Sequence, residues 1–183
     1  MSDWRLTPQN TALVVVDPQE KLMAAMPHRA ETLAGIEKLV RAARLLHFPA
    51  LVTLQYVKGL GPVCPELTEV TAGLPTFEKL SFSCCGNEEF LHTIKDLRRP
   101  RIILCGVETH VCVQQTAIDL MDGTRSVYVC ADAVCSRRDL DRDVALDRLR
   151  DCGAIVTTVE AAVFEMLKAA GSAEFKACLP LWK

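Results

Sequence analysis

The chain has 183 residues, of which 50% are apolar and 24% are charged, and its formal net charge is −2. This composition is that of an ordinary globular protein, which excludes disordered and collagen-like chains, and at this length folding buries about 70% of the unfolded chain's surface. We therefore expect a single domain over residues 1–183. The negative charge, with no basic run longer than Arg98-Arg99, argues against a nucleic-acid partner.

Buried strands alternate with amphipathic helices along the chain. The first strand is the apolar, β-branched run from Thr11 to Val16, which ends at Asp17-Pro18 because proline cannot continue a ladder. Residues 31–46 then place apolar side chains at helical spacing. Further strands are predicted at 50–54, 101–105, 126–130 and 154–157, and further helices at 87–97, 110–122, 139–152 and 159–170.

This alternation predicts the fold class. Short strands buried on both faces form a parallel sheet, and parallel neighbours need right-handed crossover connections, usually helices. The predicted fold is α/β, a three-layer α/β/α sandwich with a central, mostly parallel sheet of Rossmann-like topology. The segment from Gln55 to about Asn87 lacks such a pattern and is predicted to be a long irregular loop that closes over the site.

Ligands of open α/β sheets bind outside the carboxyl ends of the strands. The residues expected there are Asp17, Gln55, the stretch from Cys105 to Cys112, and Asp132. Asp17 is either a catalytic carboxylate or a turn anchor. A haloacid-dehalogenase nucleophile would need a second aspartate where Gln19 stands, and the chain is too long for a receiver domain.

Cys112 is a second candidate because it begins an apolar-periodic helix. The positive end of a helix and its free N–H groups lower a thiol's pKa and can hold an oxyanion, although most free cysteines are inert and buried. We therefore expect Cys112 to be the most reactive thiol. Lys79 is a third candidate, in the long loop near apolar residues. Whether it has a catalytic role depends on Asp17 and Cys112.

Together these residues resemble a known superfamily. Asp17 at the end of the first strand, Lys79 in a K-x-x-F context, and the phrase from Gly106 to Val113 followed by Gln-Gln-Thr-Ala are similar to the isochorismatase-like cysteine hydrolases. The resemblance covers nearly the whole chain. The stretch from Gln55 to Gly61 is specifically similar to the isochorismatase domain-containing proteins.

The resemblance implies a catalytic triad of Asp17, Lys79 and Cys112. Asp17 would act as the general base, and the Lys79 ammonium would favour the thiolate and orient the aspartate. It also implies a cis peptide between Val107 and Glu108 and an oxyanion hole made by the backbone N–H groups of Glu108 and Cys112. The expected reaction is hydrolysis of a small carbon–nitrogen, amide-type substrate through a thioester.

Some superfamily features are missing. Nicotinamidase-type members carry an Asp-x-His metal motif after the second strand, whereas this chain has no ligand between Thr53 and Val57, so neither a metal nor another cofactor is expected. Isochorismatases that cleave a vinyl ether lack the cysteine. Gln55, Tyr56 and Phe82 are candidate pocket residues. His110 either faces the pocket or caps the helix, and we favour the cap.

Alternatives remain open. The nine cysteines suggest reduced thiols, and hence a cytoplasmic protein, because the number is odd and several lie in apolar runs. A redox function through Cys84-Cys85 ranks last, since adjacent cysteines pair only with strain. A catalytically idle scaffold that binds a partner is the main alternative to a hydrolase. The expected partners are a small-molecule substrate and further copies of the chain. The resemblance implies such copies, and the apolar segment from Phe175 to Trp182 is either covered by one of them or packed against its own chain. No membrane association is expected.

Overall fold

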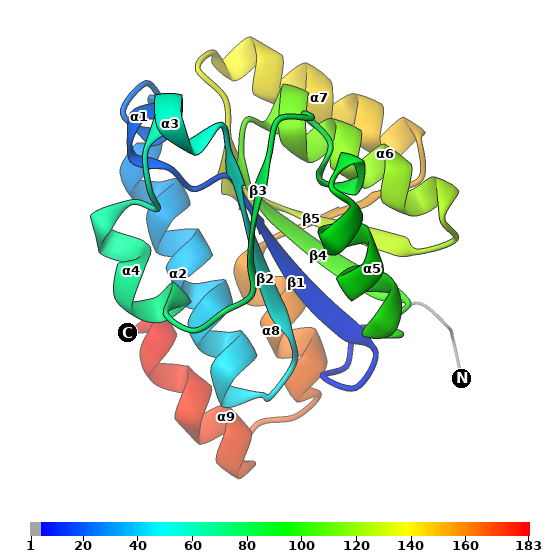
Figure 1. The fold of residues 1–183 in the computed structure, drawn as a ribbon. Coiled ribbons are helices and arrows are strands. Elements are labelled where there is room, and N and C mark those ends of the chain that lie inside the picture. Colours follow the sequence, from blue (N-terminus) through cyan, green and yellow to red (C-terminus); the bar gives the residue numbers. More distant parts are fainter. Residues whose placement is uncertain (1–4) are drawn as a thin grey trace.

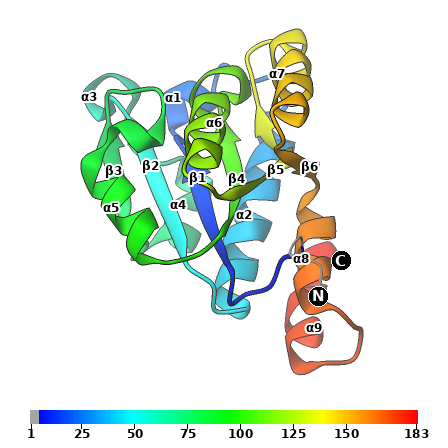
Figure 2. The ribbon, with the colours of Figure 1, turned by 90° about the vertical axis from the view of Figure 1, so that its right-hand side faces the viewer.

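A sheet of six parallel strands forms the centre of the computed structural model, which describes residues 5–183. The strand order is β3-β2-β1-β4-β5-β6, and Figure 2 shows the strands in this order from left to right. Every neighbouring pair is parallel, so the predicted α/β class is confirmed. The strands are β1 (Thr11–Val16), β2 (Ala50–Gln55), β3 (Thr76–Lys79), β4 (Arg101–Val107), β5 (Ser126–Cys135) and β6 (Ile155–Thr157).

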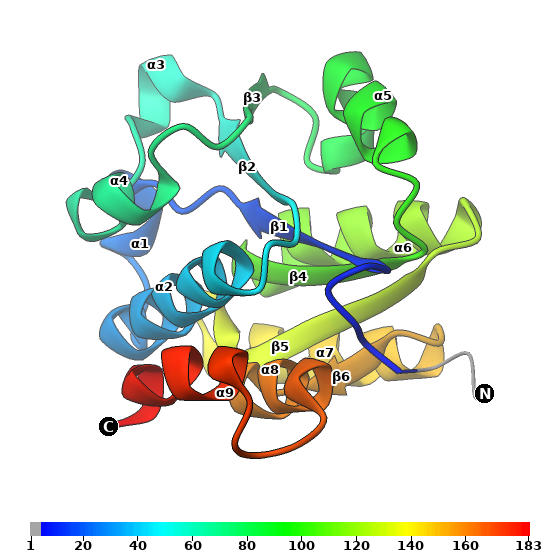
Figure 3. The same cartoon turned by 90° about the horizontal axis from the view of Figure 1, so that it is seen from below.

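Helices cover both faces of this sheet and complete three layers (Figures 1 and 3). The core accordingly has two halves: Leu13 and Val15 of β1 pack toward one helical layer, and Val14 and Val16 toward the other. Because successive side chains of a strand point to opposite faces, a strand covered on both sides must be apolar throughout. One layer contains α2 (Arg29–Leu45), α4 (Pro65–Thr71), α8 (Val159–Leu167) and α9 (Ala173–Cys178), and the other contains α5 (Glu88–Asp96), α6 (Gln114–Asp122) and α7 (Asp139–Asp151).

The segment predicted as a long irregular loop is structured, and that prediction is wrong. It contains two helices, α3 (Val57–Leu60) and α4, and the edge strand β3. In β3 the side chains alternate, with Phe77 and Lys79 buried and Thr76 and Glu78 exposed. An edge strand of only four residues with two inward side chains has no apolar run, so its sequence resembles a loop.

The end of β5 lies later than predicted, which displaces Asp132 from the site. The strand runs to Cys135, and Asp132 therefore lies inside it rather than at its carboxyl end. The Asp132 carboxylate accepts a hydrogen bond of 2.9 Å from the N–H of Val159, the first residue of α8. Asp132 thus fixes the start of a helix, and its expected place near the ligand is corrected.

The apolar C-terminal segment packs against its own chain. The rings of Phe175 and Trp182 lie 6.0 and 5.2 Å from that of Phe164 on α8, both edge to face, and Leu181 contacts the core. Of the two alternatives for this segment, packing against its own chain is the one observed, so the segment gives no argument for an oligomer.

Two further global features bear on the class of protein. All nine cysteines are free. Among residues 5–183, no helix combines the length and the hydropathy that crossing a bilayer requires.

Candidate active site

Asp17 directly follows β1, the strand at which the strand order of the sheet reverses direction. Its neighbours are β2 on one side and β4 on the other, an arrangement that opens a crevice at the carboxyl ends of the strands. Asp17 has a left-handed backbone conformation with φ of 48°, which aspartate tolerates better than most residues. Its side chain is fully buried.

Both oxygens of the Asp17 carboxylate are engaged. Oδ1 accepts a hydrogen bond of 2.8 Å from the hydroxyl of Thr53 on β2, and Oδ2 accepts one of 2.7 Å from Nζ of Lys79. Lys79 ends the edge strand β3, and its side chain is 1% exposed. The structure therefore brings together two of the three residues of the expected triad as a buried ion pair.

The Lys79 ammonium is surrounded by oxygen atoms. Burial by itself would lower its pKa, but the negative charge of Asp17 and its hydrogen bond outweigh burial and hold the pKa above its ordinary value. Lys79 is therefore permanently charged near neutral pH. Its Nζ lies 2.7 Å from both Asp17 Oδ2 and Gln55 Oε1, 3.0 Å from the carbonyl oxygen of Phe82 and 3.2 Å from that of Ser81, so its three N–H groups are shared among four acceptors.

Cys112 lies next to this pair. It belongs to a turn of π-helix, Thr109–Val113, that leads directly into α6, and it is 5% exposed. Burial raises the pKa of its thiol to about 12; the negative charge of Asp17 and a hydrogen bond to that carboxylate also raise it, and the positive charge of Lys79 lowers it. The expectation that the helix start lowers this pKa is thus wrong for the resting site, because desolvation and a neighbouring carboxylate dominate.

The end of β4 brings Cys112 to this position. Gly106 has φ of 112°, and a Cβ atom there would lie 2.0 Å from the carbonyl oxygen of Val16, so only glycine lets β4 pass so close to β1. The peptide bond between Val107 and Glu108 that follows is cis, as the resemblance implies. The Glu108 carboxylate accepts from the backbone N–H of Arg137 at 3.0 Å and from its Nε at 3.1 Å, a contact that no sequence pattern indicated.

Cys84 was not expected at the site. Its thiol lies 3.5 Å from the Thr53 hydroxyl, which in turn binds Asp17, and its backbone N–H donates to the Thr116 hydroxyl at 2.9 Å. The side chain is fully buried, and burial followed by the charge of Asp17 raises its pKa to about 12. Cys84 begins a single 3-10 turn, Cys84–Gly86, which has no distinguishing pattern in sequence, so only the fold reveals this neighbour.

The ring of His110 neither caps the helix nor lines the cavity beside Lys79. Its Nδ1 lies 3.0 Å from the hydroxyl of Ser136, just after β5. The residue that precedes the π-helical turn is Glu108, and its side chain makes no capping hydrogen bond. The prediction that His110 caps the helix is therefore wrong: its ring instead joins the π-helical turn after β4 to Ser136 after β5.

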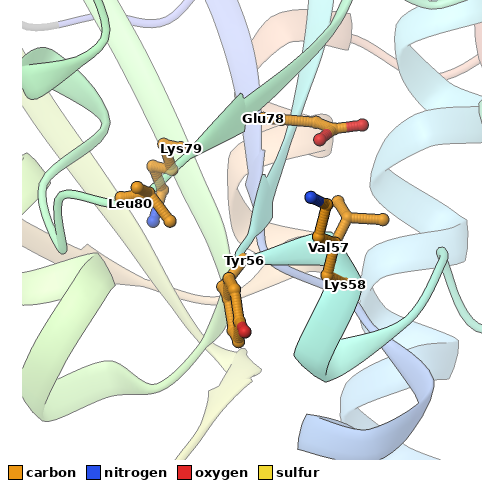
Figure 4. A pocket seen from close by; sticks show the side chains of 6 residues that line it. All are labelled: Tyr56, Val57, Lys58, Glu78, Lys79 and Leu80. Carbon is orange, nitrogen blue, oxygen red and sulfur yellow. The ribbon is translucent and has the colours of Figure 1, made fainter.

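A cavity of about 300 Å³ opens beside Lys79 (Figure 4). Of the three predicted pocket residues, Tyr56 lines it, whereas Gln55 and the carbonyl of Phe82 bind the Lys79 ammonium instead. Leu80, which lines the cavity, and Phe82, nearby in sequence, are 76% and 54% exposed. The cavity is lined by Tyr56, Val57, Lys58, Glu78, Lys79 and Leu80.

Within residues 5–183, no group of three or more His, Cys, Asp or Glu side chains is arranged to hold a metal ion. The arrangement can instead do nucleophilic chemistry. It joins a thiol to a carboxylate that can take its proton, and it places a fixed positive charge beside both.

Comparison with known proteins shows the family of this chain. The model of the isochorismatase domain matches residues 11–161. The chain is 38% identical to the secreted isochorismatase effector Isc1 of Phytophthora sojae, covering 98% of this chain and 87% of that one. It is also 38% identical to isochorismatase domain-containing protein 2 of Xenopus laevis, over 94% and 83% of the two chains.

A solved structure titled MAR1 ribonuclease from Caenorhabditis elegans superimposes with a TM-score of 0.92 at 38% identity, covering 97% of this chain and 92% of that one. The fold, the matched domain and these relatives agree with the resemblance that the sequence motifs indicated. The chain belongs to the isochorismatase domain family.

Proposed function

We propose that the protein is a cysteine-dependent hydrolase of a small, amide-type carbon–nitrogen substrate. The observation that carries this proposal is the buried Asp17–Lys79 pair with the Cys112 thiol beside the same carboxylate. A buried ion pair contributes little net stability to a fold, whereas a thiol, a base and a cation in contact form the usual machinery of acyl transfer.

The first step is attack of the Cys112 sulfur on the substrate carbonyl carbon while its proton passes to Asp17. The high pKa of the thiol means that the resting site holds a thiol and a carboxylate, so proton transfer accompanies attack. Lys79 keeps its charge throughout and stabilises the developing thiolate. Lys79 is therefore the electrostatic partner and Asp17 the base.

The tetrahedral oxyanion then collapses. The carbon–nitrogen bond breaks, Asp17 returns its proton to the leaving nitrogen, and ammonia or an amine departs from a thioester on Cys112. Water, deprotonated by Asp17, attacks the thioester and releases the carboxylic acid with the thiol restored. The proposed oxyanion donors are the backbone N–H groups of Glu108 and Cys112, at the cis peptide and in the π-helical turn.

The space beside Lys79 supports a small substrate, although neither Asp17 nor Cys112 is among the residues that line it. A cavity of about 300 Å³ suits a small molecule, and its lining combines aliphatic side chains with charges from Lys58 and Glu78. The superimposed Caenorhabditis elegans protein is named a ribonuclease. We propose no such activity for this chain, because its net charge is −2 and its sequence has no basic run longer than two residues.

The alternative is an idle scaffold that acts through a partner. Three large apolar side chains near the site are exposed, those of Tyr56, Leu80 and Phe82, and a partner that binds there would bury them. We propose that this partner is a further copy of the chain, since homo-oligomers are the commonest assemblies. Light scattering that gives the mass of one chain, 20.2 kDa, would contradict this.

A cytoplasmic location, suggested by the free thiols, also remains a proposal, because one relative is named a secreted effector.

Release of ammonia from a panel of small amides, carbamates and ureides tests the function. The wild-type protein should release ammonia from at least one class, and Cys112→Ala should release none. Cys152→Ala is the matched control. Cys152 is exposed, whereas Cys112 is buried, and Cys152 is not one of the three triad residues. Equal activity of the wild type and Cys112→Ala would refute a cysteine mechanism.

A further inference from the structure

Both ends of the Gln55 side-chain amide are engaged. Its Oε1 accepts a hydrogen bond of 2.7 Å from Nζ of Lys79, and its Nε2 donates one of 2.8 Å to the carbonyl of Leu80. The second contact decides which way the amide faces, because the opposite orientation would place an NH₂ group against the ammonium and a carbonyl against a carbonyl. The amide oxygen is thus held toward Lys79.

The backbone of Gln55 is held as firmly as its side chain. The Gln19 side chain accepts from the Gln55 N–H at 2.7 Å and donates to the Gln55 carbonyl at 2.9 Å and to the Gly61 carbonyl at 2.7 Å. Gln19 is fully buried and lies two residues after Asp17. The same clamp therefore joins the end of β1, which carries Asp17, to the end of β2, which carries Gln55.

We infer that Gln55 is a positioning residue that holds the Lys79 ammonium against Asp17 and thereby keeps the charge beside Cys112; this inference rests on the proposed function. Asp17 and Gln55 are the two nearest acceptors of Lys79, and they approach it from neighbouring strands. Between two acceptors fixed to each other, the ammonium has one position. Substrate recognition by Gln55 is disfavoured, because Gln55 is not among the residues that line the cavity and its oxygen faces Lys79.

The neutral amide also suits the chemistry better than a carboxylate would. A second negative charge beside Lys79 would offset the ammonium and raise the pKa of Cys112, as Asp17 already does. An amide oxygen instead stabilises the ammonium without adding charge. Gln55 therefore secures Lys79 at no electrostatic cost to the thiol.

Two measurements on variants test this inference. A pH titration of the side-chain NMR signals of isotope-labelled lysine gives the pKa of Lys79 without a reagent having to reach it. The rate of iodoacetamide alkylation at pH 8, followed on the Cys112 peptide, reports the thiolate fraction of Cys112. In Gln55→Met the pKa of Lys79 should fall, and a rise of about half a unit in the thiol pKa should slow alkylation roughly threefold. Gln55→Glu, which restores the acceptor, should return the pKa of Lys79 at least to the wild-type value.

Gln9→Met is the matched control, because Gln9 is exposed and precedes β1, at the amino ends of the strands and therefore away from Asp17. It should change neither the pKa of Lys79 nor the alkylation rate. Should Gln55→Met fail to fold, Gln55→Asn withdraws the same oxygen by one methylene and should shift both quantities in the same directions. An unchanged pKa of Lys79 in a folded Gln55 variant, or an unchanged alkylation rate, overturns the inference.

Lys79→Met separates this inference from the proposed function. If Lys79→Met slows alkylation and Gln55→Met does not, the positioning role fails and the triad stands. If neither variant changes the rate, Lys79 has no electrostatic effect on the thiol and both proposals fail.

Discussion

Nζ of Lys79 lies 2.7 Å from Oδ2 of Asp17, and the two side chains are 1% and 0% exposed. Each charge has lost its water, so each depends on the other and on the surrounding dipoles. This mutual dependence gives the pair measurable consequences for stability as well as for chemistry.

We expect the pair to show strong coupling in a double-mutant cycle. Lys79→Met and Asp17→Asn should each lower the free energy of unfolding by about 3 to 5 kcal/mol, because each leaves a buried charge unpaired. The double variant should lose less than the sum. Urea denaturation measures the free energy of unfolding of all three variants. Lys58→Met is the control, because Lys58 is exposed, and its free energy of unfolding should lie within about 0.5 kcal/mol of wild type. Additive losses would show that the two charges do not depend on each other.

Reactivity and turnover should respond differently to Asp17 and Lys79. The charge of Asp17 raises the pKa of the Cys112 thiol and that of Lys79 lowers it, so Asp17→Asn should speed iodoacetamide alkylation at pH 8 and Lys79→Met should slow it. Both variants should nevertheless lose as much turnover as Cys112→Ala, because the three groups act as a unit. Superimposable alkylation profiles in the three proteins would contradict the triad.

The labelling order of the cysteines should follow exposure. Cys152 is exposed and Cys85 is partly exposed, whereas Cys112 is buried with a pKa of about 12. We therefore expect sub-stoichiometric iodoacetamide to label Cys152 first, contrary to the expectation from a helix start. Peptide mass spectrometry should also show that the Cys112 rate rises about tenfold per pH unit from pH 7 to 10. A plateau below pH 9 would show a stabilised thiolate.

Stability should fall in alkaline solution because of buried thiols. Cys84 and Cys112 have pKa values raised from 9.0 to about 12. Since the folded state holds these protons more tightly, their stabilisation is complete below pH 9 and is lost as pH rises toward 12. Each thiol should contribute a slope of about 1.4 kcal/mol per pH unit.

Urea unfolding between pH 9 and 10 measures this slope without involving Lys79, whose pKa is raised above 10.5. Cys84→Ala should reduce the slope, and Cys152→Ser should leave it unchanged, because Cys152 is exposed. An identical slope in Cys84→Ala would mean that Cys84 ionises alike in the folded and unfolded states.

Chelation should leave activity intact. The proposed mechanism uses only side chains and backbone, and no cluster of metal-binding side chains occurs in residues 5–183. Ammonia release after dialysis against EDTA should equal that of untreated protein. Loss of activity that returns with added zinc would contradict a purely cysteine-based mechanism.

Local sequence patterns sufficed for the parallel sheet and for two of the catalytic candidates. β1 and β4 are buried along their whole length, so their apolar runs reveal both their position and their covered faces. A polar residue directly after such a run, as Asp17 is, must lie at the carboxyl edge. The unusual phrase around Cys112 identified the family and, through it, Lys79.

Tertiary structure alone decided the surroundings of those residues. β3 is an edge strand with alternating burial, so its pairing with β2, which places Lys79 beside Gln55, left no apolar run to detect. The pKa of Cys112 likewise depends on desolvation and on Asp17, which is distant in sequence, more than on its own helix. Propensity and periodicity are properties of neighbouring residues, whereas burial and charge pairing depend on which distant segments the fold brings together.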